Sequence, residues 1–138
     1  MVKLSSTNRR RLRILLAALW WGSLTLLGAV VVPALFAHLA PAALAGGMAA
    51  KLFSAQTWVS SGCGLALLLL SSGPAVGATR VSTAWVLAGT LAALLLEFAV
   101  APRILARENM ALWHGLGVLF FALQWLCAQV ALWQASDS

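Results

Sequence analysis

The chain has 138 residues, of which 62% are hydrophobic and 9% are charged, and its formal net charge is +6. A soluble domain usually carries about a quarter charged residues, so this composition excludes an ordinary soluble protein and indicates an integral membrane protein. The length allows only a small helical bundle, with no separate soluble domain, because each spanning helix needs about 20 apolar residues.

Four apolar runs follow one another along the chain, and each is long enough to cross a membrane as a helix. They cover residues 14–36, 54–72, 82–101 and 111–134. The runs lack the polar alternation of a membrane β-barrel, so helices are the structure that satisfies their backbone in lipid. We therefore predict an all-α membrane protein: a single domain over residues 1–138, with four transmembrane helices in an up-and-down antiparallel bundle.

A basic tail, residues 1–13, precedes the first run and contains Lys3 and the four arginines of "NRRRLR". A basic cluster that adjoins a span is typical of a cytoplasmic flank, and we expect no binding to nucleic acid. Four crossings then place both termini in the cytoplasm, and we expect a protein of the bacterial cytoplasmic (inner) membrane. A cleaved signal peptide is the alternative for the first run, although its apolar core is longer than such signals have.

Features of the loops and helix ends add four local expectations. The segment "PAALAGGMAAKLF", residues 41–53, predicts a short helix at the outer interface, from which Lys51 reaches toward the headgroups. Pro33 predicts a kink that frees the carbonyl of Ala29. Cys63 and Cys127 fall inside spans and are expected to act as small hydrophobic residues. Four tryptophans fall near predicted helix ends, as is usual at membrane interfaces: Trp58, Trp85, Trp113 and Trp133.

Polar residues inside the runs define two faces that we expect to point into the bundle. Thr83, Thr90 and Glu97 recur at seven-residue spacing in the third run, so they share one helix face. A second face in the fourth run carries His114, Gly117, Phe121, Gln124 and Ala128.

Charged and imidazole groups gather at the predicted outer end, and they form the candidate site: His38, Lys51, Glu97, Arg103 and His114. One interpretation is structural, with Glu97 paired to Arg103 or protonated and with both histidines at the interface. The other is functional: His38 and His114 bind a metal or haem, or Glu97 and His114 relay protons. We expect no cofactor under the first interpretation, and haem or a transition metal under the second.

The chain offers little for enzymatic chemistry, because it has only three acidic residues and no recognisable nucleophile with its base. The expected function is therefore that of a non-enzymatic accessory or interaction subunit. Its partners would be membrane lipid and either another membrane protein or a second copy. The alternative is a protein that handles a small molecule, metal, haem or protons through the outer-end residues.

Three segments, "WWGSLTLLGAVVVPALF", "AGGMAAKLF" and "APRILARENMALWHGLG", resemble the four-span membrane family DUF4149, also described as TMEM205-like. The matching positions are Trp21, Gly22, Ser23, Pro33, Phe36, Ala45, Gly46, Lys51, Leu52, Phe53, Arg103, His114 and Gly115. Trp58 is the only aromatic residue soon after "KLF", Gly117 stands where the pattern has a serine, and His38 and Glu97 are not part of it. The resemblance implies a four-helix membrane protein and brings no established biochemical activity.

Overall fold

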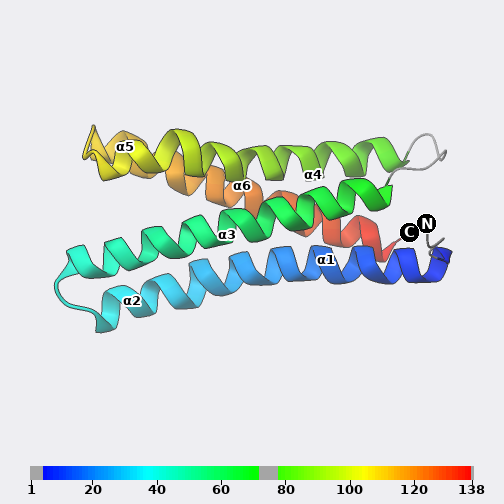
Figure 1. Ribbon diagram of the computed structural model, residues 1–138, viewed down its shortest axis with the longest axis horizontal. Helices are drawn as coiled ribbons and strands as arrows, with labels where there is room; N and C mark the ends of the chain where they lie inside the picture. The colour runs from blue at the N-terminus through cyan, green and yellow to red at the C-terminus, as the bar shows by residue number, and fades with distance from the viewer. Residues whose placement is uncertain (1–4, 72–77, 138) are drawn as a thin grey trace.

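The computed structural model describes residues 5–71 and 78–137, which form helices and short connections. Four long helical segments lie side by side as an antiparallel bundle (Figure 1). All four are long and apolar enough to cross a membrane: Ser6–His38, Ala42–Ser71, Ser82–Leu105 and Met110–Ser136. The expected four-helix membrane bundle is therefore confirmed. Lys3 of the basic tail lies outside the described residues.

The first helical segment consists of α1 (Ser6–Leu26), a π-helical turn η1 (Leu27–Val31) and α2 (Val32–His38). The second is one continuous helix, α3 (Ala42–Ser71). The third repeats the first pattern, with α4 (Ala78–Leu95), a π-helical turn η2 (Leu96–Val100) and α5 (Ala101–Leu105). The fourth is α6 (Met110–Ser136).

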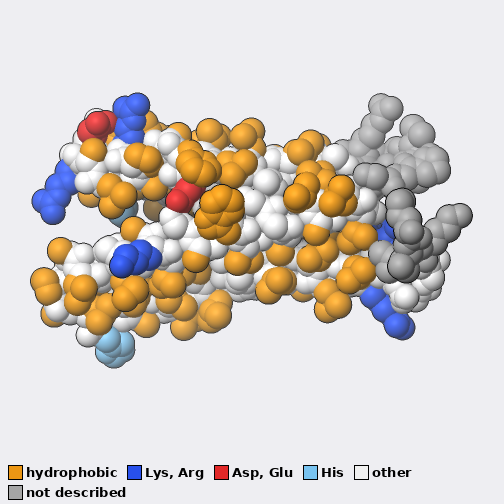
Figure 2. Space-filling model, in the orientation of Figure 1, with side chains coloured by type: hydrophobic (Ala, Val, Ile, Leu, Met, Phe, Trp, Pro, Cys, Tyr) orange, Lys and Arg blue, Asp and Glu red, His pale blue; other side chains and the backbone are white. Residues whose placement is uncertain are grey.

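The two ends of the bundle differ in the chain segments that they hold. Both termini lie at one end, the terminal end, where the side chain of Arg10 donates a hydrogen bond to the carbonyl of Ser136 (Figure 1). The turns from α2 to α3 and from α5 to α6 lie at the other end, which we call the distal end. Hydrophobic side chains cover much of the visible face between these ends, and charged groups gather mostly toward the ends (Figure 2).

The start of α3 corrects one expectation. Residues 41–53 do not form a separate interfacial helix, because α3 runs without a break from Ala42 to Ser71. Pro41 stands just before the helix, where its missing N–H costs nothing, and no later proline interrupts it. Trp58 consequently lies near the middle of a 30-residue helix, and the prediction that it marks a helix end is wrong.

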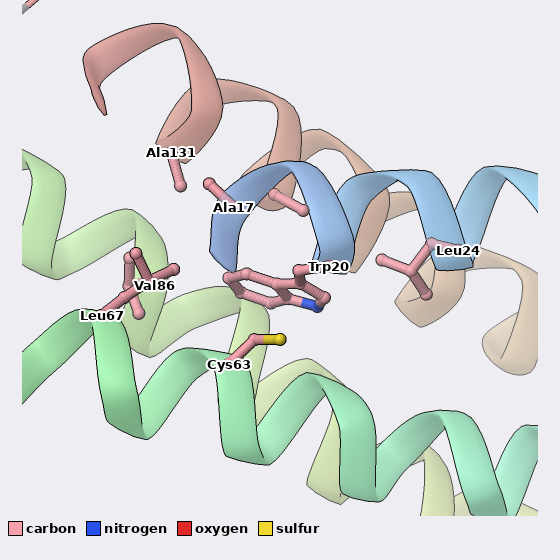
Figure 3. Packing of buried hydrophobic residues seen from close by; sticks show 8 residues of the cluster. Ala17, Trp20, Leu24, Cys63, Leu67, Val86 and Ala131 are labelled. Carbon is pink, nitrogen blue, oxygen red and sulfur yellow. The ribbon is translucent and has the colours of Figure 1, made fainter. Parts of the chain in front are cut away.

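The core centres on Trp20, whose side chain is fully buried. Its indole ring lies between helices, among side chains that include Ala17, Leu24, Cys63 and Val86 (Figure 3). Cys63 and Cys127 are both buried free thiols that pack as small residues, as expected.

Two glycines allow helices to approach closely in this core. A Cβ atom on Gly89 of α4 would lie 2.7 Å from Cβ of Cys127 and 2.8 Å from Cη2 of Trp20. A Cβ on Gly64 of α3 would collide with the hydroxyl of Thr90 on α4. Because hydrophobicity does not drive helices together within lipid, such close backbone contacts are a main source of bundle stability.

The two halves of the chain repeat one design. The first helical segment of each half has a π-helical turn that begins six residues before a proline. The turn at Leu27 precedes Pro33, and the turn at Leu96 precedes Pro102. About 20 residues after each proline comes the sequence Phe-x-x-Gln, which begins at Phe53 in α3 and at Phe121 in α6.

These equivalent elements face one another in the structure. Phe53 and Phe121 meet edge to face, with ring centroids 5.5 Å apart. Trp20 and Gly89, which precede their respective prolines by the same interval, are in contact across the core. Both first helices run from the terminal to the distal end (Figure 1). The bundle is thus a parallel pair of helical hairpins, an arrangement found among membrane proteins built from internal repeats.

Candidate functional site

A buried polar cluster links three helices in the middle of the bundle. The amide nitrogen of Gln56 donates to the hydroxyl of Ser23 at 2.9 Å and to that of Ser60 at 3.3 Å. Ser60 in turn donates to the side-chain oxygen of Gln124 on α6. Gln56, Ser60 and Gln124 are at most 8% exposed. Burying polar groups in an apolar interior is costly unless they bond one another, so these four side chains fix the relative positions of α1, α3 and α6.

A second polar contact joins α1 to α6. The indole N–H of Trp125 donates to Thr25 Oγ1 at 2.8 Å, and the Thr25 hydroxyl donates to the backbone carbonyl of Trp21 at 2.8 Å. The rings of Trp21 and Trp125 are tilted against each other, with centroids 5.8 Å apart. This arrangement satisfies a tryptophan N–H inside the bundle, away from water.

Glu97 lies in η2, where its half-buried carboxyl accepts a hydrogen bond from the hydroxyl of Ser54 on α3. The pairing of Glu97 with Arg103, one of the two structural alternatives, is not observed. Arg103 instead forms an exposed ion pair with Glu108, at 3.3 Å, and its guanidinium lies 4.9 Å from the ring centroid of Trp113. Because α5 ends soon after Arg103, the turn that follows returns Glu108 toward it.

The five candidate residues all belong to the distal half of the bundle but do not form one site. His38 ends α2, His114 lies in the second turn of α6, and both are exposed, as are Lys51 and Arg103. Within the described part of the chain, no hydrogen bond or ion pair joins any two of the five. Nor do any three His, Cys, Asp or Glu side chains described there lie close enough to hold a metal ion.

The two predicted inward faces are largely observed. Thr90 packs against Gly64 of α3, and Glu97 bonds to Ser54 of the same helix. On α6, Gln124 and Ala128 are buried, and Phe121 packs between Phe53 and Gly28. His114 is the exception, because the second turn of α6 lies at the distal end, where its imidazole is exposed.

The residues that carry the family resemblance divide into two groups. Trp21, Ser23 and Phe53 make contacts between helices. Most of the others lie at the surface or in open positions: Pro33 and Phe36 are exposed, and a Cβ on Gly22, Gly46 or Gly115 would meet nothing within 4 Å, whereas Ala45 is buried.

Pro33 follows η1 as Pro102 follows η2, so the predicted disturbance of the helix before Pro33 takes the form of a π-helical turn. A proline cannot donate to the carbonyl four residues before it, and a wider turn is one way in which the backbone adapts. π-helical turns of this kind are frequent at functional sites.

Sequence reasoning missed four partners in these contacts: Thr25, Ser54, Gln56 and Ser60. The repeated Phe-x-x-Gln segments were the available signal for Gln56, because Gln124 was already on a predicted inward face. Serine and threonine carry no such signal, since they occur throughout membrane helices and often bond only their own backbone.

The fold and its buried polar contacts define an integral membrane protein with four spanning helices. The model of the DUF4149 family, a domain of unknown function, matches residues 15–112, and the chain belongs to that family. No curated protein and no solved structure matched the chain.

Proposed function

We propose that the protein is a non-enzymatic membrane subunit that binds another membrane-spanning protein through the exposed face of α3. The observation that supports this function most strongly is the position of Trp58, which is 67% exposed near the middle of that helix. The four side chains of the buried polar cluster bond one another and so act as a scaffold for this surface.

The proposed surface, which we call the α3 outer face, follows one side of the helix. Its residues are spaced alternately by three and four positions, the spacing of side chains that face a partner helix. All are exposed: Met48, Lys51, Ala55, Trp58, Gly62 and Leu65. A Cβ on Gly62 would meet nothing within 4 Å, so another helix can approach the backbone there.

The depth of Trp58 argues for a protein partner over lipid. At 1.5 Å per residue α3 is about 45 Å long, so its middle lies near the centre of a hydrocarbon layer of about 30 Å. Tryptophan prefers the interface, where its N–H meets water, so a tryptophan exposed to lipid at the membrane centre is unfavourable. A partner helix provides both an acceptor and packing for the ring.

Lys51 argues that the partner is a different protein and not a second copy. It lies on the α3 outer face, two helical turns from Trp58 on the distal side. Two copies that paired parallel through this face would bring two lysines together in a medium of low dielectric constant, which is unfavourable. A partner helix with a carboxylate at the corresponding depth would instead form an ion pair with Lys51.

The proposal places the termini in the cytoplasm, in the cytoplasmic membrane of a bacterium. Four arginines of α1 and Arg80 in α4 belong to the terminal end, whereas the distal end holds Lys51, Arg103 and Arg107. This excess of positive charge supports a cytoplasmic terminal end. A C-terminal alkaline phosphatase fusion should be inactive and a C-terminal fluorescent protein fusion should fluoresce. An active phosphatase fusion would reverse the proposed orientation.

The binding proposal is tested by purification from native membranes in mild detergent. Wild type and Leu126→Ala, a variant at a 51% exposed position on α6, should carry the same membrane protein in fixed ratio. Trp58→Ala should reduce the amount bound by tenfold or more, because a buried tryptophan at an interface commonly contributes about 2 kcal/mol or more. Lys51→Glu should also release the partner, and exchanging the partner's acidic residue for lysine should restore binding. Equal recovery with Trp58→Ala would contradict the proposal, as would recovery of the chain with copies of itself alone.

A further inference from the structure

The setting of Glu97 distinguishes it from the other two acidic residues of the chain. Glu108 and Asp137 are exposed near the ends of the bundle, whereas Glu97 is half-buried within the third span. It lies eight residues before the end of α5, which corresponds to a depth of about 12 Å at 1.5 Å per residue. Its carboxyl accepts a hydrogen bond from Ser54 across the helix interface.

The internal repeat shows that the π-helical turn does not require this carboxyl group. Gly28 occupies the position in η1 that Glu97 occupies in η2, since each is the second residue of its turn. The turn in η1 forms with glycine at that position, and Gly28 contacts Phe121 there. An acid at this position is therefore not needed to form such a turn.

The charges around Glu97 do not neutralise it. The elements packed against η2 are α3, α4, α5 and α6. Their basic or titratable groups in the distal half, Lys51, Arg103 and His114, are exposed, and Arg103 pairs with Glu108. The thiols of Cys63 and Cys127 are buried in the core, and Arg80 of α4 belongs to the terminal end.

We propose that Glu97 is a proton-binding site in the distal half of the membrane, with the Ser54 hydroxyl as its hydrogen-bond partner. A charged side chain inside a membrane costs up to about 3 kcal/mol, and binding a proton converts the carboxylate into a neutral carboxylic acid. The site lies in the interior interface between α3 and η2 and does not depend on the partner proposed for the α3 outer face.

The test uses dicyclohexylcarbodiimide, an apolar reagent that modifies protonated carboxyl groups in apolar surroundings. The full chain is labelled in detergent or liposomes over a range of pH and is examined by intact and peptide mass spectrometry. One adduct should form, at Glu97, and it should form more slowly as the pH is raised, because the reagent reacts with the protonated carboxyl group. Glu97→Gln should abolish the adduct, and Glu108→Gln should leave it unchanged.

Ser54→Ala tests whether the hydrogen bond from Ser54 affects the reactivity of Glu97. This substitution removes the hydroxyl that bonds the Glu97 carboxyl, so the rate of labelling at Glu97 should change several-fold. Ser61→Ala, on the same helix, should leave the rate unchanged, because Ser61 has no hydrogen-bond partner among the described residues. If Glu97→Gln does not fold, the wild-type pH profile and the two serine variants still decide the question. Labelling of Glu97 that is absent at every pH, or no faster than that of Glu108, would overturn the proposal.

Discussion

Ser60 on α3 donates a hydrogen bond to the side-chain amide of Gln124 on α6, and both side chains are almost completely buried. Gln56 joins this pair from one turn away and extends the cluster to Ser23 on α1. Two of the four residues, Gln56 and Gln124, occupy equivalent positions in the repeated halves. The cluster therefore lies where the two hairpins meet, and its role is to hold them in register.

Substitution of Gln124 by leucine should destabilise the bundle by about 1 kcal/mol, because Ser60 then loses its acceptor in an apolar interior. Unfolding of the purified protein in increasing sodium dodecyl sulfate measures the change. Gln129→Leu, the same substitution on the same helix at a position that is only half-buried, should have a smaller effect. Equal effects of the two substitutions would show that the hydrogen bond does not stabilise the fold.

The hydrogen bond from the Trp125 indole to the Thr25 hydroxyl should stabilise the fold. Thr25→Val keeps the shape of the side chain but removes the acceptor for the indole N–H, and we expect a loss of about 1 kcal/mol. Thr57→Val is the control, since among the described residues the Thr57 hydroxyl bonds only the Phe53 carbonyl of its own helix. A double-mutant cycle that combines Thr25→Val with Trp125→Phe should give a measurable coupling energy. The cycle that combines Thr57→Val with Trp125→Phe should give none. Zero coupling between Thr25 and Trp125 would contradict the assignment.

Gly64 and Gly62 are two residues apart on α3 but have opposite surroundings. Gly64→Ala should destabilise the protein by about 1–3 kcal/mol, because the new methyl group collides with Thr90. Gly62→Ala should have little effect on the purified chain, since the space around it is open. The second substitution Thr90→Ala should restore much of the stability of Gly64→Ala. If Gly64→Ala is neutral, α3 and α4 do not approach as closely as described.

The two histidines can be tested for ligand binding directly. Because His38 and His114 are exposed and no described partner holds them, replacing either by alanine should change stability by less than about 0.5 kcal/mol. The purified protein should contain no metal in fixed ratio and show no haem absorption. A stoichiometric metal, or a haem band that both variants lose, would favour a ligand-binding function over the subunit role proposed above.

The arrangement of helices could be predicted from the sequence because membrane thickness sets the length of each apolar run. The inward positions of Gln124 and Ala128 could also be predicted, since a polar face in lipid has to be covered. The length of α3 could not, because alanine and glycine before residue 54 are compatible with a loop, an interfacial helix or a continuous span. That error also misplaced Trp58, now the central residue of the proposed surface.

The partners of individual polar groups could not be predicted. Glu97 and Arg103 are close in sequence, and an ion pair between them was a reasonable expectation. In the structure η2 and α5 place Arg103 beside Glu108 and turn Glu97 toward Ser54 on another helix. Such contacts depend on how each helix is rotated about its axis. Successive side chains point about 100° apart around a helix, so a small rotation changes which neighbour a side chain meets.

Site-specific photocrosslinking in living cells tests the proposed subunit role most directly. A benzophenone amino acid is placed at Ala55 or Leu65 on the α3 outer face, and at Leu87 on α4 or Leu126 on α6 as exposed controls. Our account predicts one discrete adduct with another membrane protein from Ala55 and Leu65, absent from the two controls. Lipid adducts alone, adducts of the mass of a homodimer, or the same adduct from all four positions would contradict it.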